Sequence, residues 1–225
     1  MKKIILYTLL LICNFSFSQD HTEKPNYKKI EKNSKIKNSN LFYESLMNRF
    51  TQADSTMTLE EKRHLYYGYT FDKNYSPYSR SDYEDSLRVV LQKEQLEISD
   101  FKKIEEHTNQ ILKKDPLDIK AISYQLFSLE QLNNKELFEK RLIQLKIILD
   151  AIVSSGKGIT KDDPIYVINT SHEYELLNLL GFQFGGSQSL IKNCDYLTLA
   201  ENDAHLKGLY FEVSPCLDHL AKMLK

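Results

Sequence analysis

Apolar residues recur at helical spacing through most of the first 155 residues, and this periodicity restricts the possible folds more than any other feature of the chain. Phe42, Leu46 and Phe50 show the interval of four residues that places apolar side chains on one face of a helix. The pattern predicts a half made of antiparallel helices over residues 41–155.

One of these helices has clear end signals. Thr58 and Glu61 have the spacing of a capping box, in which each side chain accepts a hydrogen bond from a backbone N–H at the start of the helix. Gly68 stands where a C-terminal glycine would end that helix. The signals predict a helix over residues 59–68.

A proline and an asparagine pair divide the following helices. Pro116 cannot continue a helix, so the apolar-striped segment before it should end there. Two further striped segments, residues 117–132 and 135–153, meet at Asn133–Asn134 and predict an antiparallel helix pair. The arrangement resembles tetratricopeptide hairpins, but no sustained repeat follows, so we expect packed hairpins and not an extended array.

Beyond Ser154–Gly158, which we interpret as a flexible joint, strand signals replace the helical period. Residues 209–213 alternate apolar and polar side chains, which is typical of a half-buried strand, and Glu201–Ala204 is suited to a hairpin loop before it. Shorter apolar runs predict further strands at residues 165–168, 182–184, 188–191 and 196–199.

Two helices complete the C-terminal half in this interpretation. Thr170 and Glu173 have capping spacing at the start of one, and Ser214 precedes Pro215 at the start of the other. The sequence therefore predicts an α+β fold, in which an N-terminal antiparallel helical half is followed by a small antiparallel β-sheet with two helices in residues 156–225. We expect the two halves to form one compact domain.

The N-terminus has the order of features of a cleavable signal peptide. Lys2 and Lys3 are followed by the apolar stretch Ile4–Ile12 and by the small-residue site Ser16–Ser18. We expect residues 1–18 to be removed near Ser18, which predicts a periplasmic or secreted protein. An apolar run of about ten residues is too short to cross a bilayer as a helix, so we expect no stable membrane insertion.

The mature chain that this cleavage would produce is slightly acidic. Residues 1–18 contain two of the 30 basic residues and none of the 31 acidic ones, which leaves a net charge of −3. Such a chain attracts neither nucleic acid nor an anionic membrane, so we expect no nucleic-acid partner. Residues 19–40 are polar and predict a tether with a short helix near Tyr27.

Cleavage would also leave two cysteines, Cys194 and Cys216, in a compartment where disulfides persist. A disulfide between them is one interpretation, and two buried free thiols are the other. No Cys or His spacing matches a metal site, so we expect no metal and no cofactor.

A tyrosine-rich segment between residues 63 and 80 is the most distinctive feature of the composition. Tyrosine offers a flat apolar face and a hydroxyl, which suits either a core or a surface that stacks on sugars or peptides. Neighbouring tyrosines on a helix point about 100° apart, so at least one of them should be core. The candidate binding residues are Arg63, His64, Tyr66, Tyr67, Tyr69, Tyr75 and Tyr78.

Catalytic motifs are weak by comparison. Glu61 and His64 have the Glu-x-x-His spacing of di-iron bundles, but a second copy is absent. Ser155–Gly158 lacks the remaining residues of a phosphate-binding loop, and no nucleophile elbow occurs. We therefore name no catalytic residue, and whether the protein is an enzyme stays open.

Several segments resemble a known family. The run from Leu59 to Phe71, together with Tyr75–Tyr78, Pro164–Ile168 and Glu173–Tyr174, is similar to the Bacteroidota proteins known as domain of unknown function 4919. The resemblance covers nearly the whole mature chain, from about Tyr27. It implies an exported bacterial protein and carries no assigned activity.

Two classes of function are compatible with these features. We expect a noncatalytic interaction or accessory module of the cell envelope or secreted space, with a tyrosine-rich surface that holds a protein or glycan partner. The alternative is a hydrolase that acts on an envelope polymer or glycan, for which no pair of carboxylates stands out. A cleft with two facing acids would favour the hydrolase, and a shallow aromatic surface would favour the binding module.

Overall fold

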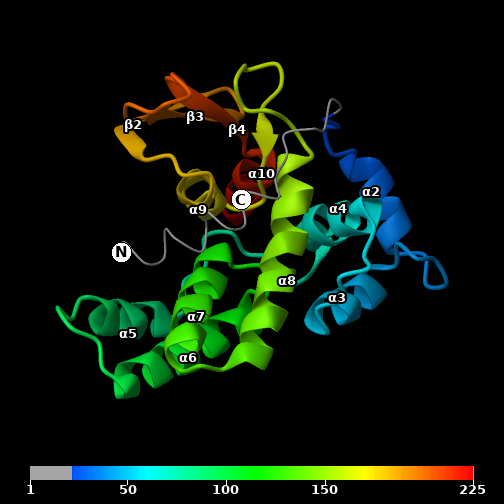
Figure 1. Cartoon of the computed structure of the whole chain (residues 1–225). Coiled ribbons are helices and arrows are strands. Elements are labelled where there is room, and N and C mark those ends of the chain that lie inside the picture. Colours follow the sequence, from blue (N-terminus) through cyan, green and yellow to red (C-terminus); the bar gives the residue numbers. More distant parts are fainter. Residues whose placement is uncertain (1–21, 225) are drawn as a thin grey trace. The chain divides into compact units, whose positions relative to one another are not determined.

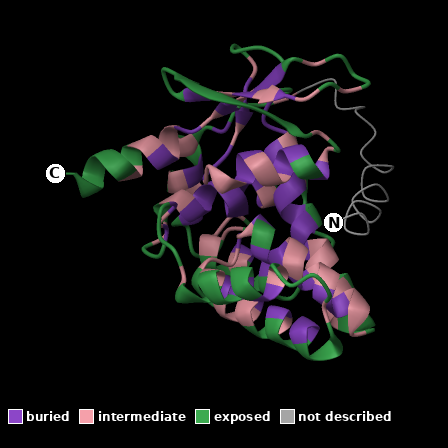
Figure 2. Ribbon diagram, turned by 90° about the vertical axis from the view of Figure 1, so that its left-hand side faces the viewer, coloured by how far each residue is buried: buried purple, intermediate pink, exposed green. Residues whose placement is uncertain are grey.

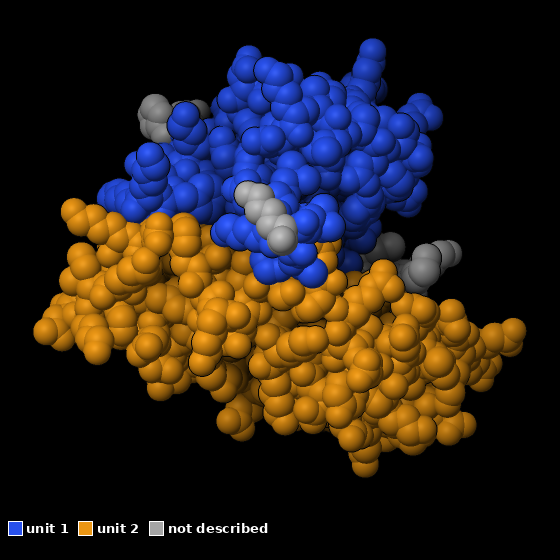
Figure 3. Space-filling view, turned by 180° about the vertical axis from the view of Figure 1, so that it is seen from behind, with its two compact units in different colours: residues 1–30, 149–225 blue, residues 31–148 orange. Residues whose placement is uncertain are grey.

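The computed structural model describes residues 22–224, and the chain divides into two compact units (Figure 1 and Figure 3). Among the described residues, the helical unit comprises residues 31–148, and the sheet unit comprises residues 22–30 together with residues 149–224. The division differs from the predicted halves because the sheet unit includes both the segment before residue 31 and the end of the last long helix. The predicted signal peptide, residues 1–18, lies outside the described residues.

Seven α-helices and one 3-10 helix account for most of the segment from residue 27 to residue 153 (Figure 1). The helix α2 begins within the predicted tether and buries Ile30, so this segment is ordered and partly packed. In chain order the elements are α2 (Tyr27–Ser34), α3 (Tyr43–Thr51), α4 (Leu59–Gly68), η1 (Tyr69–Phe71), α5 (Asp82–Leu91), α6 (Ile98–Lys114), α7 (Ile119–Gln131) and α8 (Lys135–Val153).

The predicted capping box is confirmed, but the predicted glycine stop is wrong. The Thr58 side chain accepts a hydrogen bond from the Glu61 N–H, and the Glu61 carboxylate accepts one from the Thr58 N–H. Gly68 has a right-handed φ of −67°, so the chain continues into η1 and does not turn into the left-handed region. The helix pair joined at Asn133–Asn134 is confirmed, and Asn133 takes the positive φ of 55° at the joint.

A buried polar network joins the helices of the helical unit. The Gln125 side chain, which is fully buried, donates to Asn109 on α6 at 2.8 Å and accepts from Arg141 on α8. Arg141 also donates to Gln144 at 2.6 Å, and Gln144 donates to the Phe50 carbonyl at 2.9 Å. Since buried polar groups are costly unless paired, this network selects one register of α3, α6, α7 and α8.

The sheet unit contains a four-stranded sheet in the order β1-β4-β3-β2. Its strands are β1 (Ile165–Tyr166), β2 (Phe184–Ile191), β3 (Cys194–Leu199) and β4 (Gly208–Glu212). The sheet is mixed and not purely antiparallel, because β1 runs parallel to β4 with Ile165 opposite Phe211. The helix α9 (Ser171–Leu179) carries the chain from β1 at one edge to β2 at the other, which makes this parallel pairing possible.

The two short runs predicted at residues 182–184 and 188–191 belong to one irregular strand. The register of β2 against β3 shifts between Phe184 and Gln188, and Gly186 takes a positive φ of 90° there. Every residue of β2 is exposed, whereas β3 and β4 alternate buried and less buried residues (Figure 2). Both β1 and β2 are edge strands, but Ile165 of β1 is buried whereas neither face of β2 is covered.

The helical segment followed by a small sheet with helices confirms the predicted α+β class. The last helix, α10 (Ser214–Met223), has Pro215 in its first turn, but Val213 and not Ser214 occupies the N-cap position. Within residues 22–224, no helix combines the length and the apolar content that a bilayer crossing requires.

Candidate functional site

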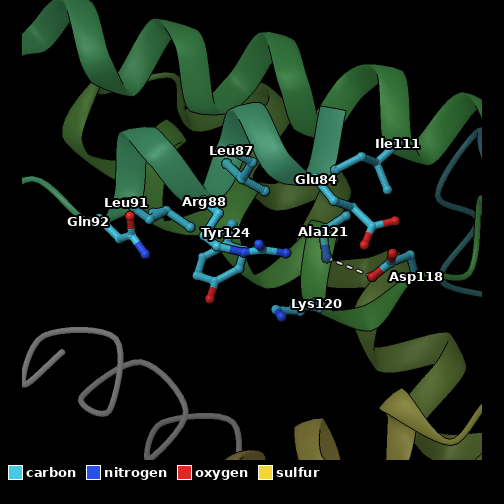
Figure 4. Close-up of a pocket in the computed structure, with 10 residues that line it drawn as sticks. All are labelled: Glu84, Leu87, Arg88, Leu91, Gln92, Ile111, Asp118, Lys120, Ala121 and Tyr124. Carbon is cyan, nitrogen blue, oxygen red and sulfur yellow. Dashed lines mark hydrogen bonds between the residues drawn. The ribbon is translucent and has the colours of Figure 1, made fainter. Parts of the chain in front are cut away.

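A pocket of about 180 Å³ opens in the helical unit, between α5, the end of α6 and the start of α7 (Figure 4). One part of its wall is apolar and consists of Leu87 and Leu91 from α5, Ile111 from α6 and Ala121 from α7. The remaining lining residues are polar or charged, namely Glu84, Arg88, Gln92, Asp118, Lys120 and Tyr124. The pocket is smaller and more polar than most small-molecule sites, and it combines an apolar wall with charged groups of both signs.

Helix capping holds the two acids of the pocket in place. Glu84 is the third residue of α5, and its Oε1 accepts a hydrogen bond of 2.8 Å from the Ser81 N–H. Asp118 is the N-cap of α7, and its Oδ1 accepts a hydrogen bond of 2.8 Å from the Ala121 N–H. Each carboxylate therefore keeps one oxygen for its cap and has a second oxygen for other contacts.

Burial and the charge of neighbouring carboxylates raise the pKa of Asp118 and of the nearby Asp115. Burial, and then the charge of Glu84, raises the pKa of Asp118, although the hydrogen bond from Ala121 opposes this effect. The neighbouring Asp115 has a pKa raised to about 7, mainly by burial and then by the charge of Asp118. The charge of Lys120 lowers the pKa of Asp118 and offsets part of this repulsion, and a bound cation would relieve more of it.

Tyr69 is the residue of the tyrosine-rich segment that contacts Asp115. The Tyr69 hydroxyl hydrogen-bonds with Asp115, and burial followed by the Asp115 charge raises the pKa of Tyr69. Burial and the charge of Asp72 likewise raise the pKa of Tyr43. Both tyrosines therefore remain protonated and neutral beside the carboxyl groups.

Two cations and an aromatic ring form the other polar part of the pocket. The side chain of Arg88 lies beside the Tyr124 ring, and Lys120 lies below them in the view of Figure 4. Arg88 makes an ion pair of 3.0 Å with Asp85, but both side chains are more than half exposed. An exposed pair of this kind contributes about 0–1 kcal/mol, so Arg88 can exchange Asp85 for a ligand at little cost.

Most of the predicted binding residues lie in the core of the helical unit. Tyr66 and Tyr67 are fully buried and pack edge to face with ring centroids 5.0 Å apart. Tyr69 and Tyr75 are also buried, whereas Tyr78 is 40% exposed. Burial of these rings favours the core interpretation for every member of the set except Tyr78.

The two cationic members of the set are also buried. The Arg63 guanidinium lies over the Tyr67 ring at 5.8 Å from its centroid. The His64 Nδ1 donates to the Glu60 carbonyl at 2.9 Å, so the Nε2 accepts from the Asn33 side chain at 3.2 Å. Both nitrogens of the ring are thus engaged in structural hydrogen bonds.

A second pair of acids lies in the sheet unit, where the sequence predicted only a helix cap. Glu173 makes no cap hydrogen bond and is fully buried on α9. Its pKa is raised to about 9, first by burial and then by the charge of Asp195 on β3. Neither carboxylate oxygen of Glu173 has a partner in regular hydrogen-bond geometry among the described residues. Burial is therefore the main cause of its raised pKa. Asp195 in turn accepts a hydrogen bond of 2.8 Å from Gln188.

Cys194 and Cys216 are both buried, and no disulfide joins them in the structure. Cys194 lies opposite Glu212 at the end of the β3–β4 ladder, and Cys216 follows in the first turn of α10. Both therefore lie near the same end of the ladder, as the sequence predicted, but unbridged. Among the described residues, no group of three or more His, Cys, Asp or Glu side chains is arranged to hold a metal ion.

The fold and the pocket define an α+β protein with a helical unit that carries a charged, partly apolar ligand pocket. The model of the family described as Domain of unknown function (DUF4919) matches residues 28–222, and the chain belongs to this family. No curated protein and no solved structure matches the chain.

Proposed function

We propose that this protein is an exported binding module of a Bacteroidota cell envelope or secreted space, which holds a protein or glycan partner without changing it chemically. The observation that carries the proposal is the pocket between α5 and α7, where an apolar wall meets charged groups of both signs. Such a lining suits recognition of a partner group by contact and charge.

The positions of the acids support binding more than catalysis. Glu84 and Asp118 each use one oxygen to accept a backbone hydrogen bond at a helix start, which fixes them in place. Fixed acceptors lose little conformational freedom when a ligand binds. Outside the pocket, Phe71 and Tyr78 are members of the tyrosine-rich segment that offer exposed rings to a larger partner.

A pull-down from envelope extract tests the proposal. Gln92 is exposed at the edge of the pocket, so Gln92→Trp should obstruct the pocket without disturbing the core. Ser86→Trp is the matched control, because Ser86 is exposed on the same helix and does not line the pocket. We expect wild type and Ser86→Trp to retain a partner that Gln92→Trp loses. Failure of the wild-type protein to retain any partner would contradict the proposal.

A hydrolase is the second candidate, and one observation favours it. Glu84 and Asp118 line the same pocket, and burial followed by the charge of Glu84 raises the pKa of Asp118, as expected for a catalytic acid near a second carboxylate. Incubation with envelope polymers or glycans should then release fragments, and Asp118→Asn should abolish the release. Partner retention without fragment release supports the binding module instead.

A further inference from the structure

The arrangement of charges in the pocket indicates what kind of small group it binds. Glu84 and Asp118 lie at one end, and Arg88 lies beside Tyr124 farther along the pocket (Figure 4). Glu84 and Arg88 are four residues apart on α5, so their Cβ atoms are about 5–6 Å apart. Opposite charges are thus carried by side chains that start from neighbouring positions on one helix face.

We infer that the pocket binds an α-amino acid group, with its ammonium at Glu84 and Asp118, its carboxylate at Arg88 and an aliphatic side chain against the apolar wall. This inference rests on the proposed binding function and specifies the group that enters the same site, either as a free amino acid or as an unmodified α-amino acid end carried by a partner. In an α-amino acid a single carbon separates the ammonium from the carboxylate. The neighbouring positions of Glu84 and Arg88 on one helix face fit this compact zwitterion.

Each end of the pocket has charged groups that can bind one of the two charges of such a ligand. At the acidic end, the capping hydrogen bonds engage one oxygen of Glu84 and one of Asp118, and a primary ammonium has three N–H donors for the other oxygens. At the basic end, Arg88 pairs with Asp85 and not with Glu84, and that exposed pair is easily exchanged. A planar guanidinium then offers two parallel donors to a carboxylate.

The remaining lining and the size of the pocket agree with an aliphatic side chain. Leu87, Leu91 and Ile111 provide apolar contact on the side of α5 and α6. The volume of about 180 Å³ corresponds to roughly six water molecules at about 30 Å³ each. This space suits one residue-sized ligand, whereas an extended polymer would need a longer groove.

Calorimetric titration of the full mature chain with L-leucine tests the inference. Two analogues of leucine test the contributions of its two charged groups separately. Leucinamide keeps the ammonium and lacks the carboxylate, and 4-methylpentanoate keeps the carboxylate and lacks the ammonium. We expect leucine to bind at least tenfold more tightly than either analogue. A leucine-leucine dipeptide distinguishes a free amino acid from a peptide end, because its two charges are farther apart.

Variants that preserve the helix caps isolate the charges. Glutamine at the third helical position and asparagine at the N-cap retain the capping hydrogen bonds, so Glu84→Gln with Asp118→Asn removes charge and not structure. We expect this double variant to bind leucine at least tenfold more weakly. Arg88→Gln should weaken leucine binding but not leucinamide binding. Glu94→Gln, at an exposed position in the α5–α6 loop, is the control and should bind as wild type.

Proton release provides an independent readout. An ammonium at the acidic end favours the charged form of Asp118 and so lowers its raised pKa. At a pH low enough for Asp118 to be partly protonated in the free protein, binding should therefore release protons, and the measured heat should change with the ionisation enthalpy of the buffer. Absence of leucine binding, or equal binding by wild type and the double variant, overturns the inference. If the pull-down still retains a partner in that case, the binding function stands and only the ligand class is wrong.

Discussion

Replacing Glu173 with glutamine tests the buried acid pair of the sheet unit, because the substitution keeps the size of the side chain and removes its charge. Glu173 is fully buried, and burial followed by repulsion from Asp195 raises its pKa from 4.5 to about 9. The folded protein therefore keeps this carboxyl group protonated at neutral pH. In the unfolded chain the same group loses its proton near pH 4.5.

This difference makes stability depend on pH. Between pH 4.5 and about 9, the folded state holds a proton that the unfolded state has released, so the free energy of unfolding falls as pH rises. The contribution of Glu173 is fully present below pH 4.5. Each pH unit corresponds to about 1.4 kcal/mol, so this one residue should cost the protein about 3 kcal/mol between pH 4.5 and pH 7. Glu173→Gln binds no proton and should lose this part of the pH dependence.

Urea unfolding followed by circular dichroism at pH 5, 6, 7 and 8 measures the effect. We expect the stability of Glu173→Gln relative to wild type to rise steadily over this range. A stability difference that is the same at every pH reflects only how well the amide packs in place of the carboxyl group. The test is therefore how the difference in the free energy of unfolding changes with pH. Glu201→Gln, at an exposed position of the β3–β4 loop, is the control and should follow the wild-type slope. Parallel curves for Glu173→Gln and wild type would refute the reasoning.

Three further predictions concern other parts of the chain. Tyr67→Ala should destabilise the helical unit by about 3 to 5 kcal/mol in denaturant unfolding, because it empties a fully buried site. The exposed Tyr78→Ala should have little effect. An unchanged stability of Tyr67→Ala would place that ring outside the core. Thiol titration of the unfolded, unreduced protein should detect the thiols of Cys194 and Cys216, because no disulfide joins them in the structure, and an absence of thiols would establish the disulfide. The intact mass of protein recovered from its source should correspond to a chain that begins at Gln19, and retention of residues 1–18 would contradict export.

Local signals in the sequence were sufficient for most of the helical elements. The capping box at Thr58 and Glu61, the stop at Pro116 and the joint at Asn133 depend on residues a few positions apart, so their geometry is set by the neighbouring backbone. The strand pattern at residues 209–213 is equally local. These features predicted the α+β class before any tertiary contact was considered.

Gly68 and Glu173 show where local reasoning failed. Gly68 has the position of a helix stop, but the tyrosines after it are buried and continue the helical path into η1. Glu173 has the spacing of a capping residue, but α9 packs so that the side chain is buried near Asp195. In both cases tertiary packing overrides a signal that is worth only about 1 kcal/mol.

The sequence by itself determined which segments form helices and strands, because those choices rest on hydrophobic period and capping within a few residues. Only the tertiary structure decided which tyrosines are core and which acids meet. Glu84 and Asp118 come from different helices and form one end of a pocket only when α5 packs beside the start of α7. Their separation along the chain leaves no local pattern, since the contact arises from packing and not from spacing.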